Sequence, residues 1–190
     1  EGEAERLQSN KQSLYSFEDI KFDPKELVGK NGLNNIVKYE ISTSPPARFN
    51  FEFVSEKYNN IFAREVVGKY SSKIKSIIDN IFNSEGIILI YSQYIDGGLI
   101  PMALALESIG FTRYGDTKSL FKNPPIEKLD VNSYLPKSSV NKEKFNAAKY
   151  VMITGDKSIT PNFTTDLKAT TNETNKNGKD IKVILISQAG

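Results

Sequence analysis

The sequence predicts an α/β fold in three layers, with a mainly parallel sheet held between helices. Three short runs rich in apolar and β-branched residues, at 87–91, 150–154 and 181–186, are typical of parallel strands covered on both faces. Segments with helical patterns lie before and between these runs, and parallel neighbours need such crossover connections. The chain has 190 residues, 38% of them hydrophobic, which suits about one domain with a core of its own.

Residues 1–63 carry scattered aromatic side chains without a sustained helical or strand period. We expect them to form an irregular N-terminal arm or interdomain segment, followed by the α/β domain at 64–190. Within the arm, the run FNFEFV at 50–55 alternates apolar and polar residues, which predicts a short strand.

The first helix of the domain is predicted at 72–83, after a serine cap at Ser71 or Ser72. Its isoleucines recur at the spacing of one helical face. They are Ile74, Ile77, Ile78 and Ile81. Gly86 then interrupts the helical pattern, and the strand at 87–91 follows.

A second helix is predicted at 99–109, directly after the turn signal Asp96-Gly97-Gly98. It is apolar almost throughout, as expected of a buried crossover helix. Pro101 falls in its first turn and Gly110 follows its last residue, where each is favoured.

The rest of the domain alternates again between strand and helix patterns. A short strand at 111–114 precedes a polar, lysine-containing segment at 115–148, which we interpret as an insertion. A strand at 150–154, a helix at 162–170 and a strand at 181–186 follow. Only Ser-Gln-Ala-Gly comes after the last strand, and parallel domains rarely end on such a loop. We therefore expect the domain to be incomplete at its C-terminus.

The composition excludes several classes of enzyme. The chain has no Cys and no His, which removes thiolate and imidazole nucleophiles, general bases and the usual zinc ligands. The net charge of +2 is too small to indicate nucleic acid or anionic lipid by itself. No apolar run is long enough for a membrane-spanning helix and the first residues are acidic and polar, so we expect a soluble, intracellular protein with no membrane partner.

Both common nucleotide-binding motifs are missing, and three loops at predicted strand ends take their place as candidates. Neither the Walker A motif nor the dinucleotide-binding glycine motif occurs. Carboxyl ends of parallel strands meet at one edge, and small residues there let backbone amides approach an anion. The loops comprise Ser92, Gln93 and Tyr94, then Gly155, Asp156 and Lys157, and finally Ser187, Gln188, Ala189 and Gly190. Local capping and ordinary turns are the alternative explanation for the same residues.

The order and spacing of these segments resemble the second RecA-like domain of superfamily 2 helicases and translocases. The resemblance covers residues 64–190: the segment IILIYSQYIDGGLIPMALALESIGFTRYG at 87–115, then YVMITGDKSIT at 150–160, then IKVILISQAG at 181–190. Within that superfamily, the chain is most similar to helicases of large cytoplasmic DNA viruses, including poxvirus and mimivirus-like ones. The IYSQ segment matches motif IV, and VILISQAG matches the start of motif V.

The resemblance implies a P-loop-NTPase-like motor half that grips the sugar-phosphate backbone of DNA or RNA. Ser92, Gln93, Ser187 and Gly190 would contact phosphates, with the 155–157 loop beside them. Tyr94 would stack on a base, or else be buried or cap its loop. ATP and Mg²⁺ would bind only with the first RecA-like domain, so no catalytic residue is assigned in these 190 residues. Other implied partners are that first domain and viral transcription machinery, in a virion or host cytoplasm. Two alternatives stay open: the nucleotide-sugar half of a glycosyltransferase, and a non-catalytic interaction domain.

Overall fold

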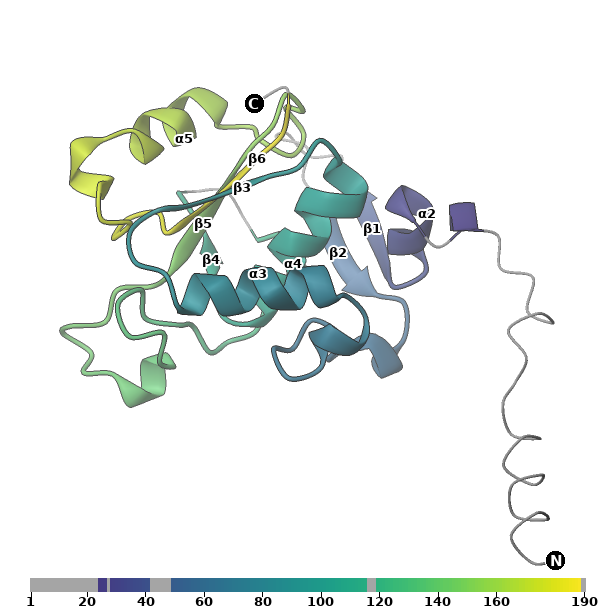
Figure 1. The fold of residues 1–190 in the computed structure, drawn as a ribbon, viewed down its shortest axis with the longest axis horizontal. Helices are drawn as coiled ribbons and strands as arrows, with labels where there is room; N and C mark the ends of the chain where they lie inside the picture. The colour runs from purple at the N-terminus through teal and green to yellow at the C-terminus, as the bar shows by residue number, and fades with distance from the viewer. Residues whose placement is uncertain (1–23, 27, 42–48, 116–118, 189–190) are drawn as a thin grey trace, which may run out of the picture.

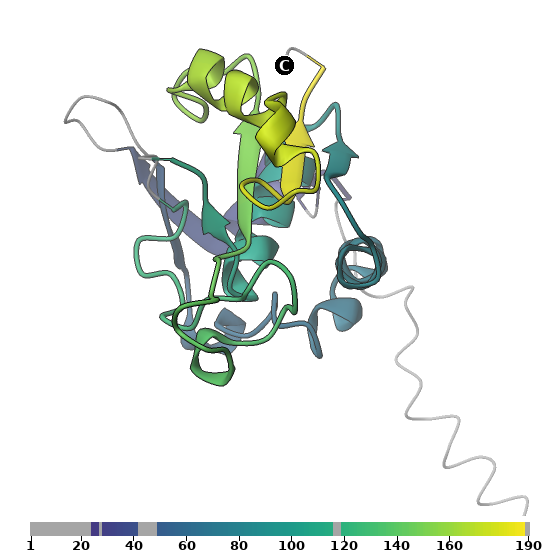
Figure 2. The ribbon, with the colours of Figure 1, turned by 90° about the vertical axis from the view of Figure 1, so that its left-hand side faces the viewer.

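The chain folds around a four-stranded parallel sheet, which confirms the predicted α/β class (Figure 1). The computed structural model describes residues 24–26, 28–41, 49–115 and 119–188. The order across the sheet is β3-β6-β5-β4, so the last strand along the chain is inserted between two earlier ones (Figure 2). The strands are β3 (Ile88–Tyr91), β4 (Thr112–Arg113), β5 (Lys149–Ile153) and β6 (Val183–Ile186).

Helices lie on both faces of this sheet and make three layers. The helices α3 (Ser72–Phe82) and α4 (Ile100–Ser108) lie on one face, and α5 (Phe163–Thr170) lies on the other (Figure 1). Side chains alternate along each strand, so Met152 and Leu185 join the larger core with α3 and α4, whereas Val151 and Ile153 pack with α5. None of the helices in the described residues is long and apolar enough to cross a bilayer.

Both predicted helices around the first strand are present, close to their expected bounds. The Ser71 hydroxyl accepts a hydrogen bond from the Ile74 amide at 3.2 Å, which caps α3. Its stripe buries Ile78 and Ile81 completely. A π-helical turn, η4 (Ile95–Leu99), leads into α4, and Gly110 after the helix has a φ of +106°.

The strand β3 differs from its prediction, because it lies at the border of the sheet rather than in its centre (Figure 2). Its sequence is as apolar as that of a central strand, yet α5 covers β5 and β6 and leaves β3 bare on that face. Leu89 and Tyr91 are consequently 63% and 60% exposed. The apolar run therefore correctly predicted that this segment is a strand, but its predicted position in the centre of the sheet was wrong.

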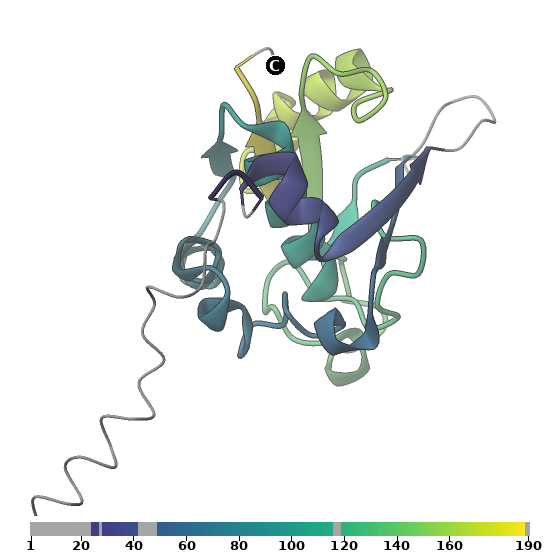
Figure 3. The same ribbon diagram turned by 90° about the vertical axis from the view of Figure 1, so that its right-hand side faces the viewer.

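The described part of 1–63, expected to be irregular, contains a helix and a hairpin. These are α2 (Gly29–Asn34) and the antiparallel strands β1 (Val37–Ile41) and β2 (Phe49–Phe53), the last of which overlaps the predicted strand at 50–55. They pack beside α4 (Figures 1 and 3). Val37 and Phe51 are almost fully buried in the main core, so hydrophobic burial orders a segment that lacks a clear period.

One buried carboxylate binds the described part of the 115–148 insertion to the core, and a second holds the insertion itself together. Glu107 of α4 accepts hydrogen bonds from the Leu120 and Phe121 amides. Asp130 accepts from the Asn132, Ser133 and Asn146 amides at about 3.0 Å. Burial raises the pKa of Asp130, but these hydrogen bonds outweigh it and hold that pKa below its usual value.

Short helical turns connect the main elements. They are η1 (Pro24–Glu26), η2 (Glu56–Tyr58), η3 (Val67–Lys69), η5 (Lys137–Ser139) and η6 (Glu173–Asn175).

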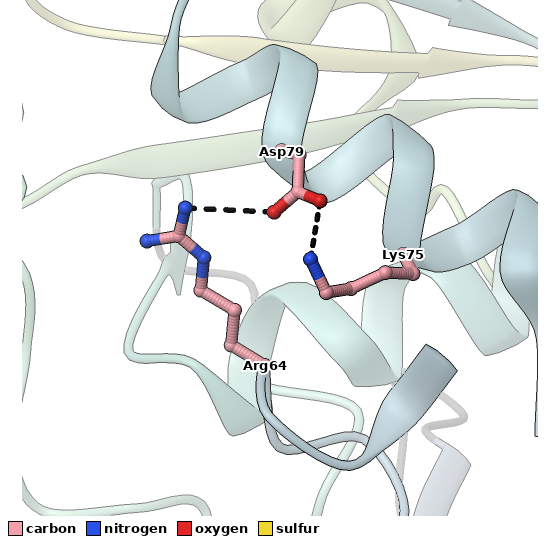
Figure 4. A network of polar contacts seen from close by, with 3 residues as sticks. All are labelled: Arg64, Lys75 and Asp79. Carbon is pink, nitrogen blue, oxygen red and sulfur yellow. Dashed lines mark hydrogen bonds and ion pairs between the residues drawn. The ribbon is translucent and has the colours of Figure 1, made fainter. Parts of the chain in front are cut away.

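An ion-pair network attaches the 59–66 segment to α3 (Figure 4). The Asp79 carboxylate lies between the Lys75 ammonium, one turn earlier on the helix, and the Arg64 guanidinium at 3.5 Å. Arg64 also stacks on the Phe82 ring, 4.0 Å from its centroid. The hydrogen bond from Lys75 is the main reason that the pKa of Asp79 is lowered.

We expect Asp79→Asn to remove a small, pH-dependent part of the stability. A carboxylate with a lowered pKa stabilises the fold above its unfolded pKa, and this contribution is lost as the pH falls through the folded pKa. The difference in urea midpoint between wild type and Asp79→Asn should therefore be present at neutral pH and vanish in acid. Glu143→Gln, at an exposed position, is the control and should leave the midpoint at neutral pH unchanged. Equal midpoints at neutral pH would show that the network contributes nothing.

Candidate nucleic-acid interface

The carboxyl ends of three strands lie side by side at one edge of the sheet. Ile186 of β6 is opposite Tyr91 of β3 on one side and Ile153 of β5 on the other. The next residues continue the ladder, because the Ser92 amide donates to Ile186 O and the Ser187 amide donates to Ile153 O, each at 3.1 Å. We call the residues that follow, 92–94, 154–157 and 187–188, the strand-end rim. Three loops far apart in sequence thus meet along one line.

The first position of each loop carries a hydroxyl group. Ser92, Ser187 and Thr154 occupy successive strands in the same row, two residues beyond Ile90, Leu185 and Met152. Because side chains alternate along a strand, these hydroxyls belong to the face that packs with α3 and α4. Thr154 completes the row, although it was not among the site residues predicted from the sequence. Comparing the residues that directly follow each predicted strand would have identified it.

The Ser92 hydroxyl holds the loop that leads from β3 into η4 and α4. Its oxygen accepts from the Tyr94 amide at 3.1 Å and donates to the Tyr94 carbonyl at 3.0 Å. Gly98 packs against it so closely that a Cβ there would lie 2.3 Å from Ser92 Oγ. The first helical bond runs from the Leu99 amide to the Tyr94 carbonyl, so the amides of 95–98 precede it at a helix N-terminus. Glycine is required here because the helix start lies directly over the rim.

The loop after β5 forms a compact turn beside the N-terminus of α5. The Thr154 and Thr160 hydroxyl oxygens are 2.8 Å apart, and both are buried. The Asp156 carboxylate accepts from the Ser158 amide at 2.8 Å, so its structural role is to cap this turn. Lys157 is exposed and lines a hollow of about 610 Å³ together with Gly155, Thr160 and the first residues of α5.

The third loop begins with a buried hydroxyl that is left unpaired. Ser187 is 5% exposed, and its Oγ has no hydrogen-bond partner within the described residues. Buried hydroxyl groups are nearly always hydrogen-bonded, because leaving one unpaired costs about 1–3 kcal/mol. Within the described part of the chain, this hydroxyl is therefore a donor without an acceptor in an otherwise hydrogen-bonded polar row.

Ser187 also lies between connections that leave the sheet for opposite faces. The helix after β3 lies on one face of the sheet, and the helix after β5 lies on the opposite face, with β6 between the two strands (Figure 1). In α/β sheets, ligands bind beyond the strand ends at the place where connections leave for opposite faces. Ser187 follows β6, between two such connections.

The structure brings most of the predicted site residues together. Ser92 and Ser187 lie in the hydroxyl row, whereas Gln93, Tyr94, Lys157 and Gln188 are exposed around it, and Tyr94 is 65% exposed rather than buried. Gly155 and Asp156 belong to the β5 turn. Ala189 and Gly190 lie outside the described residues. The contribution of Gly98 was missed, because its importance depends on a contact with Ser92 that only the folded chain shows.

The rim combines donors with only a modest charge. Lys157 is its cation, whereas the carboxylates of Asp156 and the nearby Asp96 oppose an anion. No cluster of three or more acidic side chains in the described part of the chain could hold a metal ion. The geometry therefore suits weak binding of phosphate groups through amides, hydroxyls and one lysine.

Comparison of the chain with protein-family models, with curated proteins and with solved structures found no match.

Proposed function

We propose that this chain is the strand-gripping half of an ATP-dependent nucleic-acid helicase or translocase, and that the strand-end rim holds the sugar-phosphate backbone. The observation that carries the proposal is the meeting of the loops after β3, β5 and β6 along one edge, where the connections after β3 and β5 leave for opposite faces of the sheet. Two helix N-termini and the unpaired Ser187 hydroxyl add donors at the same place. ATP and Mg²⁺ would bind between this chain and a further RecA-like domain.

The arrangement favours backbone contacts over base recognition. Amides, small hydroxyls and a single lysine suit phosphate oxygens, which every sequence presents alike. The Tyr94 ring, 65% exposed next to the row, offers a surface on which a base could stack. Because two carboxylates lie near the rim, we expect weak binding, with a dissociation constant on the order of 10⁻⁴ to 10⁻⁶ M as for other sequence-independent contacts.

Binding of a fluorescent oligothymidylate, followed by anisotropy over a salt series, tests the proposal. We expect Lys157→Ala to weaken binding and to reduce the slope of log affinity against log salt by about 0.7, the value for one phosphate contact on a single strand. Lys168→Ala is the matched control, because it removes the same charge from an exposed site in the last turn of α5. It should leave the slope unchanged.

Ser187→Ala provides an independent arm of the same experiment. Removing an unpaired buried hydroxyl should leave thermal stability unchanged or higher. Loss of a hydrogen bond to a charged phosphate should nevertheless lower the affinity by about tenfold. No binding at low salt, or equal losses for the Lys157 and Lys168 variants, would contradict the proposal. If a nucleotide sugar raised the melting temperature while oligothymidylate did not bind, the rim would serve the transferase alternative.

A further inference from the structure

The strand β3 leaves one side of its backbone unpaired. In the described residues, β3 is hydrogen-bonded to β6 alone. The Ile88 amide donates to Lys182 O at 2.9 Å and the Ser92 amide donates to Ile186 O, so these residues face β6. Alternation along a parallel strand then directs the amides and carbonyls of Leu89 and Tyr91 away from the sheet. Two residues therefore present a complete set of strand-pairing groups at the border.

The side chains at this border lack the usual protection against another strand. Natural edge strands carry lysine, proline or a bulge, which prevents pairing with a second chain. The segment IILIYSQY at 87–94 has no charged residue, proline or glycine. Leu89 and Tyr91 are 63% and 60% exposed on the face that α5 leaves bare, next to the half-buried Ile184 and Ile186. Both the backbone and the side chains of β3 are therefore suited to pairing with another strand.

We propose that two copies of this chain associate through antiparallel pairing of their β3 strands. A two-fold axis at Ile90 would place Leu89 of one copy opposite Tyr91 of the other, where the pair exchanges both amide–carbonyl hydrogen bonds. One continuous sheet would result, with four strands from each copy. The axis is perpendicular to the sheet, so the exposed leucine and tyrosine side chains of both copies pack together on the same face.

A second copy fits this edge because the edge is complementary to itself. The outward-facing residues, 89 and 91, are symmetric about Ile90, so one rotation satisfies both copies with the same residues. Since 87–94 is uncharged, the pairing sets no like charges opposite one another. Antiparallel strands point their carboxyl ends in opposite directions, so the two strand-end rims lie at opposite ends of the joined sheet. The pairing itself requires no nucleic acid.

Sedimentation equilibrium of the full chain, from low micromolar to near-millimolar concentration, tests this pairing. Two short strands bury less than the roughly 1,000 Å² of a stable specific interface, so we expect a weak, concentration-dependent dimer. Leu89→Lys and Tyr91→Lys should each raise its dissociation constant at least about tenfold, because a charge on the edge opposes pairing. Ile126→Lys is the matched control, since Ile126 is 96% exposed on another loop, and it should dimerise like wild type.

Residue-resolved amide exchange by NMR identifies the surface that is used. The Leu89 and Tyr91 amides should become protected as concentration rises, whereas the Ile88 and Ser92 amides, already bonded to β6, should not change. A monomer over the whole range overturns the proposal. So does a dimer that survives Leu89→Lys with the Leu89 and Tyr91 amides unprotected, which would place the contact elsewhere. Association with an extended peptide, without self-association, would likewise replace the second copy with a foreign strand.

Discussion

Glu107→Ala should lower the free energy of unfolding by about 3 kcal/mol or more, because it leaves three buried donors without an acceptor. The Glu107 carboxylate accepts from the Leu120 amide at 2.7 Å, the Phe121 amide at 2.9 Å and the Tyr150 hydroxyl at 2.6 Å. It is 1% exposed. One side chain thus connects α4, the insertion and β5. Urea denaturation followed by circular dichroism measures the loss.

Two conservative variants separate the charge from the hydrogen bonds. In Glu107→Gln the carbonyl oxygen can keep two donors, but the amide nitrogen faces the third, so we expect a loss of about 1.5 kcal/mol. Tyr150→Phe leaves the carboxylate with both amides and should cost about 1 kcal/mol. The double variant then gives the coupling between the two side chains. An alanine variant as stable as wild type would refute this role for Glu107.

The pH dependence of this group has a defined sign. Burial raises the pKa of Glu107 above its usual value, so the carboxyl binds its proton more tightly in the folded chain than in the unfolded one. Its stability contribution is therefore complete below the unfolded pKa and is lost as the pH rises through the folded pKa. The difference in free energy of unfolding between wild type and Glu107→Gln should therefore decrease as the pH rises from the unfolded to the folded pKa.

Gly178→Ala should lower the free energy of unfolding by about 2–4 kcal/mol, because a side chain at this position is opposed both by the backbone conformation and by a close contact. Its φ of +70° is unfavourable for any residue with a side chain. In addition, a Cβ at Gly178 would lie 2.8 Å from the Gly86 carbonyl oxygen and 3.0 Å from its carbon. The turn before β6 thus contacts the backbone just before β3, so we expect the change also to displace β6 and the Ser187 loop that follows it.

Gly86→Ala separates the two contributions to that loss. Gly86 has nearly the same φ, +71°, but an added Cβ would meet no atom within 4 Å. It should therefore show only the conformational strain, about 1 kcal/mol. Equal melting temperatures for the two variants would mean that the close approach of the turns is unimportant. A larger effect of Gly178→Ala, accompanied by weaker oligothymidylate binding, would connect strand placement with the rim.

Local patterns in the sequence were sufficient to predict the main elements. The isoleucine spacing and the serine cap predicted α3, and the three apolar runs predicted the strands around which the sheet is built. The convergence of the loops at Ser92, Gly155 and Ser187 followed from a general property of parallel sheets, which depends on strand direction alone. The placement of the predicted loops was therefore derivable, although their ligand was not.

Features that depend on contacts across the fold could not be derived in this way. The position of β3 at the border depends on the strand order, and the exposure of Leu89 and Tyr91 depends on which strands α5 covers. No property of 87–91 indicates either. The hairpin of β1 and β2 is ordered by burial of Val37 and Phe51 against distant residues. Glu107 is one acidic residue in an otherwise apolar helix, and its three donors come from segments 13 to 43 positions away.

The insertion of β6 between β3 and β5 has a kinetic consequence. Ile88 is opposite Val183, so almost half the chain must be synthesised after β3 before its neighbour exists. Pairings between such distant segments form slowly, because a long loop must close first. During translation the uncharged stretch 87–94 would stay without a neighbour until the last strand left the ribosome. Chaperone demand and inclusion-body formation should accordingly depend on this stretch more than on any other strand of the sheet.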